Sequence, residues 1–374
     1  MTTLDDWTND IHIGDAEATL ADMPADAVHM CMTSPPYFGL RDYGEDGQIG
    51  LEESLDAYID ELVAVFEEVR RVLRPDGVAW LNLGDSYGPD KQKQLVPHRV
   101  AIALQDAGWV VRNDVTWVKP NPMPSSVKDR LNTTTEQVFM LAPNPDYWFD
   151  LDAIREPYNE TTEDRYQYEP PKGEAHDDYA DATPISGGDG TVSLHESGKN
   201  PGDVFEVTTK PFPEAHFAVY PPELVEKPLK ATCPPEVCAG CGSPYERETR
   251  DESGFTEGVC NACGESRSKH KQGTKNSESR SAMSGETRAC SKNVFEEWSP
   301  TCDCDTDATE PGVALDPFAG AGTTALVAKD HGRRFVGIDL NPEYVAMAQK
   351  RLGLDVHDPS LVREEAEAGL DDFA

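Results

Sequence analysis

Short apolar runs alternate with longer amphipathic segments along the first part of the chain. Residues 27–32 form an apolar run that predicts a buried strand, whereas residues 55–73 repeat apolar side chains at helical spacing. Ser54 can cap this helix, and the Pro-Asp-Gly sequence at residues 75–77 is expected to end it. The same pattern predicts strands over residues 11–15, 78–83 and 109–117 and a helix over residues 95–107. This alternation predicts an α/β fold whose mostly parallel sheet has helices on both faces.

The alternation returns near the end of the chain. A strand over residues 313–316 runs into a glycine-rich turn, and a helix over residues 324–329 follows. Residues 335–338 predict the next strand. After it, Asn341 can cap a further helix with Pro342 at its first position.

Between these two parts the composition changes. From residue 156 to about residue 200, apolar residues thin out, which predicts a loop-rich insertion. Eight of the nine cysteines lie between residues 233 and 304. In a cytosolic chain such clustering indicates a metal site rather than disulfides. Residues 266–288, within this segment, are polar and predict a loop.

Charge changes the expected environment of the protein. The chain has 69 acidic and 33 basic residues, a net charge of −36. Such a chain either avoids nucleic acid or stays soluble in a cytoplasm with molar salt, where the Debye length is about 3 Å. The acidic residues recur along the whole chain, which favours the halophilic interpretation. With no run of about 18 apolar residues and no secretory signal at its start, we expect a cytoplasmic protein without a membrane partner.

The loop after the strand at residues 27–32 offers the first candidate chemistry. Its sequence is Thr-Ser-Pro-Pro-Tyr, and two prolines stop the strand and stiffen the loop. The loop presents a hydroxyl, carbonyl oxygens and an aromatic ring at the edge of the sheet where α/β proteins bind ligands. A planar base with an exocyclic amine needs such partners. The candidate catalytic residues are Ser34, Pro35, Pro36 and Tyr37.

The glycine-rich turn after residue 316 has the pattern of a nucleoside-cofactor site. Glycines let the backbone approach the ligand, and an acidic residue about 20 positions later can accept from ribose hydroxyls. Asp316 precedes the turn and Asp339 follows it. The turn is not GxGxxG and has no P-loop lysine, so an adenosine-type cofactor fits better than a dinucleotide or a triphosphate.

The order TSPPY, then far downstream DPFAGAGTT, resembles the β class of amino-methylating DNA methyltransferases. The resemblance implies a Rossmann-like S-adenosylmethionine-dependent fold with a circularly permuted motif order, in which the catalytic half precedes the cofactor half. Its departures are Ala321, where the family often has Ser, and the long cysteine insertion. It also implies the candidate cofactor-binding residues Asp15, Thr33, Asp316, Pro317, Phe318, Gly320, Gly322, Thr323, Thr324 and Asp339.

Three further segments resemble elements of that family. Gly14-Asp15 is similar to the early GD element near the cofactor adenine. Residues 117–136 are similar to the WxK…DR…E segment, which here contains Lys119 and Glu136. Residues 201–204 and 216–221 resemble the segment that closes over the methionine end of the cofactor.

The resemblance implies direct methyl transfer to the exocyclic amine of a base that has left duplex DNA, with Tyr37 stacked on it. Ser34 before Pro-Pro-Tyr resembles the cytosine-N4-specific members, whereas adenine-N6 enzymes usually have Asp or Asn there. Adenine-N6 methylation, an RNA substrate, and a zinc-dependent DNA-binding module with an inactive methylase site remain alternatives. No Pro-Cys nucleophile of a C5-cytosine enzyme occurs, and Cys31 is expected in the core.

Two CxxC pairs, separated by 18 residues and each followed by glycine, indicate a structural zinc site. The resemblance offers another set, in which the first pair joins the CxC pair. The second pair then needs partners such as Cys290, Cys233 or His270. The pairing stays open, and the candidate zinc ligands are Cys238, Cys241, Cys260, Cys263, Cys302 and Cys304.

These interpretations divide the chain into six parts. They are a catalytic half (1–155), a variable insertion for target recognition (156–198), a segment closing the cofactor site (199–232), a zinc-binding insertion (233–310), a cofactor-binding half (311–355) and an acidic tail (356–374). The expected partners are double-stranded DNA and a cognate restriction endonuclease, with the enzyme a monomer or homodimer. By resemblance to other halophilic chains, CTAG is the suggested target.

Overall fold

The computed structural model describes residues 3–158, 197–210, 219–253, 255–256, 259–260 and 291–357. The chain divides into two compact units. The first comprises Met1–Asp150, Gly202–Tyr245 and Pro300–Ala374, and the second comprises Leu151–Pro201 and Glu246–Ser299. All sites discussed below lie within the first unit.

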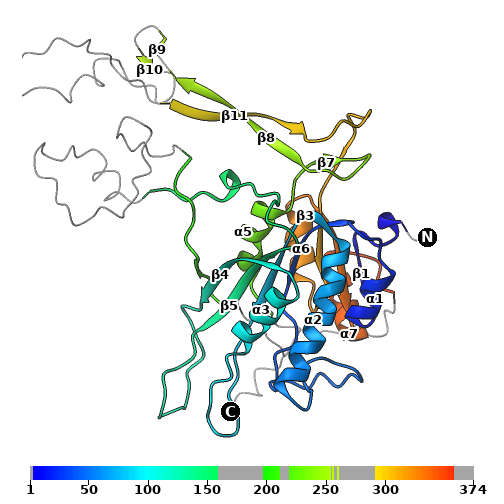
Figure 1. The fold of residues 1–374 in the computed structure, drawn as a ribbon, viewed down its shortest axis with the longest axis vertical. Helices are drawn as coiled ribbons and strands as arrows, with labels where there is room; N and C mark the ends of the chain where they lie inside the picture. Colours follow the sequence, from blue (N-terminus) through cyan, green and yellow to red (C-terminus); the bar gives the residue numbers. More distant parts are fainter. Residues whose placement is uncertain are drawn as a thin grey trace, which may run out of the picture. The chain divides into compact units, whose positions relative to one another are not determined.

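An eight-stranded sheet forms the centre of the first unit, in the order β1-β14-β13-β2-β3-β5-β4-β6 (Figure 1). In this sheet β5 runs antiparallel to both its neighbours, and the other strands share one direction. The predicted, mostly parallel sheet is therefore confirmed. The strands are β1 (Asp10–Ile13), β2 (Val28–Thr33), β3 (Leu73–Leu83), β4 (Val110–Val118), β5 (Thr135–Ala142), β6 (Val204–Glu206), β13 (Val313–Asp316) and β14 (Arg334–Asp339).

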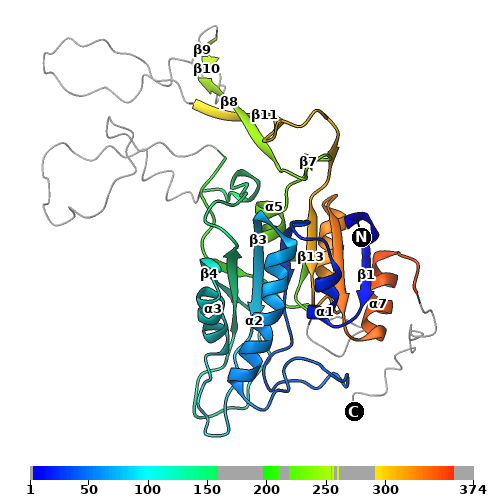
Figure 2. The ribbon, with the colours of Figure 1, turned by 45° about the vertical axis from the view of Figure 1, so that its right-hand side comes forward.

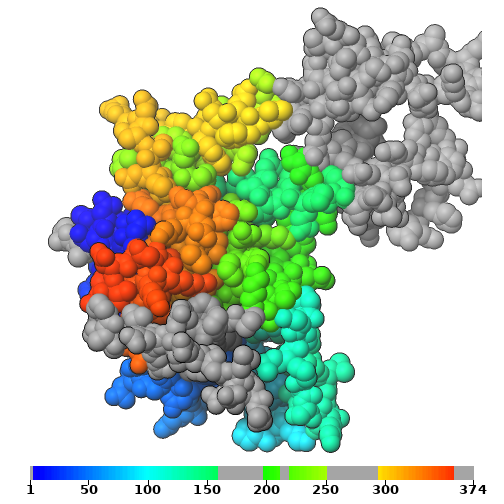
Figure 3. All heavy atoms as spheres, turned by 180° about the vertical axis from the view of Figure 1, so that it is seen from behind, coloured from blue at the N-terminus to red at the C-terminus, as the bar shows by residue number. Residues whose placement is uncertain are grey.

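Helices cover both faces of this sheet, as predicted. One core joins the sheet to α1 (Ala16–Asp22), α2 (Leu55–Val72) and α3 (Val96–Asp106). The other joins it to α5 (Pro222–Thr232), α6 (Thr323–Asp330) and α7 (Pro342–Leu352). Figure 2 shows α1, α2 and α7 along the strands, and Figure 3 shows the face where the green α5 segment adjoins the orange and red C-terminal segments.

Strand β2 shows why both faces are apolar. Its side chains alternate, so Cys31 packs in the first core while Met30 and Met32 pack in the second. A strand buried on both faces becomes a continuous apolar run, which is the pattern at residues 27–32. The expectation that Cys31 is a core residue is confirmed.

The helix termini follow the predicted capping residues. Ser54 Oγ accepts a hydrogen bond from the Ala57 amide at 3.1 Å at the start of α2. Asn341 Oδ1 accepts from the amides of Glu343 (2.8 Å) and Tyr344 (3.1 Å) at the start of α7. These bonds satisfy amides that the first helical turn leaves unpaired.

Two predicted boundaries were wrong. Strand β3 begins at Leu73 and includes the Pro-Asp-Gly sequence that we expected to precede it. Its pairing with β2 jumps from Val28–Leu73 to Met30–Val78, so the residues between bulge out of the ladder. Strand β1 ends at Ile13, before Gly14-Asp15, because Asp15 caps α1.

Smaller elements complete the fold. The first unit has a two-stranded pair of β7 (Val237–Cys238) and β12 (Thr309–Glu310). Two further strand pairs are β8 (Tyr245–Ser253) with β11 (Ser291–Pro300) and β9 (Phe255–Thr256) with β10 (Val259–Cys260). Two short 3-10 turns are η1 (Leu4–Asp6) and η2 (Asp152–Ile154). Most of the predicted insertion 156–198 and all of the predicted loop 266–288 lie outside the described residues. Among the helices described, we find none with the length and apolar character that a membrane crossing requires.

Candidate active site

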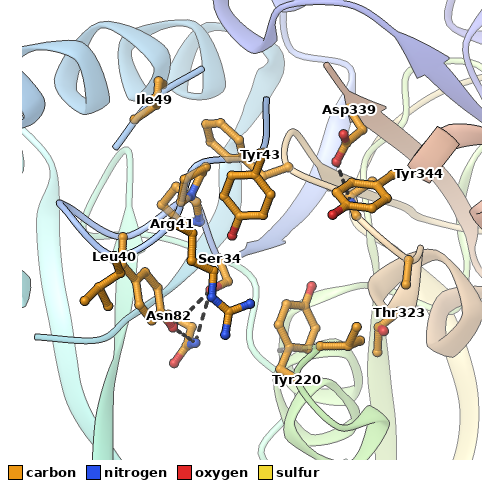
Figure 4. A pocket seen from close by; sticks show the side chains of 18 of the residues that line it. Ser34, Leu40, Arg41, Tyr43, Ile49, Asn82, Tyr220, Thr323, Asp339 and Tyr344 are labelled. Carbon is orange, nitrogen blue, oxygen red and sulfur yellow. Dashed lines mark hydrogen bonds between the residues drawn. The ribbon is translucent and has the colours of Figure 1, made fainter. Parts of the chain in front are cut away.

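The candidate site lies where β2 and β13 end side by side. These strands pair in parallel, so the loops that follow them leave the same edge of the sheet. The loops line a cavity of about 780 Å³, a size typical of a small-molecule site. Figure 4 shows Ser34 and Asn82 at one end of it and Asp339 and Tyr344 at the other. The predicted site residues that line it are Asp15, Ser34, Pro35, Pro36, Tyr37, Pro317, Phe318, Gly320, Thr323 and Asp339.

A polar network fixes Ser34. Its Oγ donates to Tyr37 Oη and accepts from Asn82 Nδ2, both at 3.2 Å. Tyr37 Oη donates to Glu136 Oε2 at 2.8 Å, and Lys119 Nζ pairs with the other oxygen of Glu136. Burial, reinforced by the Glu136 charge, raises the pKa of Tyr37 well above its ordinary value. The Tyr37 hydroxyl therefore stays protonated and can hold this arrangement at neutral pH.

Two contacts hold the Pro-Pro-Tyr segment itself. Tyr58 Oη, from α2, donates to the Pro36 carbonyl oxygen at 2.9 Å. The Tyr37 ring lies so close to Gly84 that a Cβ there would come within 2.5 Å of Tyr37 Cε2. Position 84 must therefore be glycine for the ring to lie where it does.

Asp339 lies at the opposite end of the cavity. Its carboxylate accepts from the Gly320 amide at 2.7 Å and from the Asn341 amide at 2.9 Å. Burial raises the pKa of Asp339 to about 6, although both hydrogen bonds favour its charged form. Gly320 has a φ of +49°, which suits glycine at this turn. Asp15 also lines the cavity, and it caps α1 by accepting from the Ala18 amide at 2.9 Å.

Four predicted cofactor residues lie behind the cavity wall, namely Thr33, Asp316, Gly322 and Thr324. Asp316 is buried, and its carboxylate accepts from Thr33 Oγ1 at 2.7 Å and from Tyr220 Oη at 2.8 Å. Thr324 Oγ1 contacts Tyr220 Oη at 2.5 Å and donates to a β2 carbonyl oxygen. Burial raises the pKa of Asp316. This cluster ties the ends of β2 and β13 together beneath the cavity.

Four of the candidate zinc ligands meet in the first unit. The sulfur atoms of Cys238, Cys241, Cys302 and Cys304 lie within 4.8 Å of one another. Pairing of β7 with β12 brings the two cysteine pairs together. Four sulfurs bound at about 2.3 Å to one zinc ion would lie about 3.8 Å apart, so the cluster fits this metal. Of the other pair, the Cys260 side chain and all of Cys263 lie outside the described residues.

The cysteine cluster is attached to the sheet by two side chains. His29 of β2 is buried, and its Nδ1 accepts from the Val313 amide at 3.1 Å while Nε2 contacts the Gly242 carbonyl oxygen at 3.0 Å. Burial lowers the pKa of His29 to about 4, so the ring is neutral and Nε2 carries the proton. Arg74 of β3 donates to the Cys241 carbonyl oxygen at 3.0 Å.

The family model described as DNA methylase (N6_N4_Mtase) matches residues 28–238 and 307–350. The chain belongs to this DNA methylase family. The matched ranges include both the Ser34 loop and the Asp339 turn.

Type II methyltransferases are among the relatives of this DNA methylase. M.XycI of Xanthomonas campestris pv. cyanopsidis is 32% identical, over 91% of this chain and 86% of its own length. M.SfiI of Streptomyces fimbriatus is also 32% identical, over 90% of this chain and 89% of its own. The fold is similar to that of a solved structure named PvuII DNA methyltransferase (cytosine-N4-specific). The match covers 93% of this chain and 87% of that one, with a TM-score of 0.53 and 17% sequence identity. That likeness supports the fold.

The sequence analysis missed several residues that line this DNA methylase's cavity, Asn82 among them, and left two others without a role. Asn82 is a buried amide within the otherwise apolar end of β3, and that contrast is the signal that could have revealed it. Lys119 and Glu136 were noted as part of a motif, yet nothing in the local sequence indicates that they join the Ser34 network. Pairing of β4 and β5 with β3 brings them there.

Proposed function

We propose that this DNA methylase is a site-specific methyltransferase that uses S-adenosylmethionine to methylate the exocyclic N4 of cytosine in duplex DNA. The observation that carries the proposal is the single cavity that joins the Ser34 network to the Asp339 turn. One end offers partners for an amine, and the other offers partners for a nucleoside. The permuted motif order expected from the sequence agrees with this division, because the Ser34 half comes first.

The Asp339 end fits S-adenosylmethionine. The Asp339 carboxylate, held by two amides, can accept from the ribose hydroxyls. Open space above Gly320, where a Cβ would meet no atom within 4 Å, lets a ligand approach the turn. Tyr344, Phe318 and Met347 provide an apolar wall for a purine. When bound, this cofactor supplies an electrophilic methyl group on its sulfonium.

The Ser34 end is suited to an amine. Ser34 Oγ and the Pro35 carbonyl oxygen can accept the two amine hydrogens and so orient the nitrogen. The Glu136–Tyr37–Asn82 network holds Ser34 in place, so this orientation is established before the base arrives. The base must first leave the duplex, and the Tyr37 ring is the surface on which it stacks.

We propose cytosine rather than adenine as the target because Ser34 before Pro-Pro-Tyr resembles the motif of the cytosine-N4-specific members of the family. A hydroxyl can accept from either amine, so adenine-N6 methylation is the competing outcome. The test is methyl transfer in molar KCl to DNA and RNA of matched sequence, followed by nucleoside analysis. N4-methylcytosine in DNA supports the proposal, whereas N6-methyladenine or methylated RNA would refute it. DNA binding without cofactor binding would instead support the alternative of a zinc-dependent module with an inactive methylase site.

We further propose one structural zinc ion on Cys238, Cys241, Cys302 and Cys304. Closely spaced thiolates need a cation, and zinc prefers tetrahedral sulfur ligands. The ion would fix the chain at β7 and β12, directly before β13 leads into the glycine-rich turn at the Asp339 end of the cavity. We also propose a halophilic, cytoplasmic setting and a partner restriction endonuclease. The halophilic setting predicts that the protein is more stable in molar KCl than in dilute buffer.

A further inference from the structure

The loop between β4 and β5 exposes large apolar side chains whose role the proposed function does not explain. Leu131 is 90% exposed and Met123 is 88% exposed. The Asn132 side chain donates to the Met123 carbonyl oxygen at 3.2 Å, which holds the two arms of the loop together. Two large apolar side chains left almost wholly in water, on a chain this acidic, suggest a surface that another molecule covers.

This loop forms part of the cavity rim. Pro122, Met123 and Thr133 line the same cavity as Ser34. Its two ends carry Lys119 and Glu136, the ion pair of the Ser34 network. Figures 1 and 2 show the β4–β5 loop at the same end of the sheet as the blue segment between β2 and α2. A molecule that delivers a base to Ser34 therefore passes beside Met123 and the loop that carries Leu131.

Charge near the loop identifies the kind of partner. The loop itself, residues 119–134, holds three lysines and arginines and one acidic residue, in a chain with a net charge of −36. Arg130 stacks over the Tyr87 ring at 3.9 Å, and Lys91 pairs with Asp129 at 2.6 Å, so the loop after β3 supports this one. Lys128 is exposed on the same loop. Cations beside an apolar tip match a phosphate backbone beside stacked bases.

We infer that the β4–β5 loop enters duplex DNA, with Leu131 inserted at the space that the target base vacates and Lys128 and Arg130 near the phosphates. The inference rests on the proposed function and adds the means by which the base is kept out of the helix. An apolar wedge offsets part of the unstacking cost of base flipping. Removing it should slow methylation only where the base must be flipped.

The test uses Leu131→Ser, with Leu131→Met as the conservative variant. Ile102→Ser is the matched control, because Ile102 is also exposed, at 58%, but lies on α3. The substrates are a paired duplex with the methylated sequence and the same duplex with an abasic site opposite the target base. For Leu131→Ser we expect kcat/KM to fall about tenfold or more on the paired duplex and to return to within about threefold of wild type on the abasic duplex, since that base is already unpaired. Leu131→Met and Ile102→Ser should stay near wild type on both.

Two results would overturn the inference while leaving the proposed function intact. One is a wild-type rate for Leu131→Ser on the paired duplex. The other is an equal loss on both duplexes, which would mean that Leu131 acts on binding or folding rather than on flipping. If wild-type protein methylates neither duplex, the proposed function itself fails and the inference fails with it.

Discussion

The two ends of strand β2 differ in whether their side chains are available to bind a ligand. At its carboxyl end, the Ser34 network lines an open cavity. At its amino end, His29 is buried, and both ring nitrogens are occupied by the backbone of Val313 and Gly242. About five residues of strand, roughly 16 Å, separate His29 from Ser34. One end is therefore built to receive a ligand, and the other is built to hold the sheet to the cysteine cluster.

The largest effect on activity is expected at the carboxyl end of β2, where Ser34 lines the cavity. Ser34→Ala removes an acceptor for the base amine while leaving the Asp339 turn intact. We expect kcat to fall about 100-fold or more, as for loss of one preorganised hydrogen-bonding group, with cofactor affinity within about twofold of wild type. Methyl-transfer kinetics and calorimetry measure the two quantities. A parallel loss of cofactor affinity would show that the two ends of the cavity are not separable.

Cys241→Ser tests the cysteine cluster held at the amino end of β2. The variant should lose one zinc ion per chain, and the free energy of unfolding should fall by about 2 kcal/mol or more. Because Cys241 is exposed, little packing is lost with its sulfur. Cys233→Ala is the control, since Cys233 is a buried thiol outside the cluster and should keep the metal. Unchanged zinc content in Cys241→Ser, measured by mass spectrometry, would contradict the assignment.

Asp339 should make cofactor binding depend on pH. Its raised pKa of about 6 means that the carboxylate is charged above pH 6 and gains a proton below it. We expect the Kd of S-adenosylmethionine to rise about tenfold for each pH unit below 6, because the protonated acid is a poorer acceptor. Asp339→Asn should bind more weakly at pH 8 and lose this pH dependence. A variant with the wild-type slope would exclude Asp339 as the titrating group.

His29→Leu should have the smallest effect on activity. The substitution leaves the Val313 amide and the Gly242 carbonyl oxygen without their partner, at a cost of about 1–3 kcal/mol of unfolding free energy. Catalysis below the unfolding transition should change little, since His29 lies away from the cavity. His29→Gln, which can donate and accept, is the variant expected to recover part of the loss. A change in kcat without a change in stability would contradict the division between the two ends.

Local pattern was enough to predict much of the fold. The apolar run of β2 before Ser34, the strand that ends at Asp316, and the caps Ser54 and Asn341 each depend on neighbouring residues, and the structure confirms these elements. Bringing Ser34 and Asp339 to one cavity was also predictable, because parallel strands end at one edge.

What the sequence could not reveal depends on pairing between distant segments. Asn82, Glu136 and Lys119 meet Ser34 through the register of β3, β5 and β4, and that register has no local signature. The choice among cysteine sets was open for the same reason, until the pairing of β7 with β12 brought Cys238 and Cys241 to the CxC pair. The bulge at residues 74–77 likewise reflects tertiary pairing that overrides a local turn signal.

The most direct test of the central claim is the identity of the methylated base. The chain and its Ser34→Ala variant would be expressed in cells that lack DNA methylation, and their DNA sequenced with detection of modified bases. The account predicts N4-methylcytosine at one defined sequence with the wild-type chain and none with the variant. N6-methyladenine at a defined sequence, or N4-methylcytosine that persists in Ser34→Ala, would contradict it.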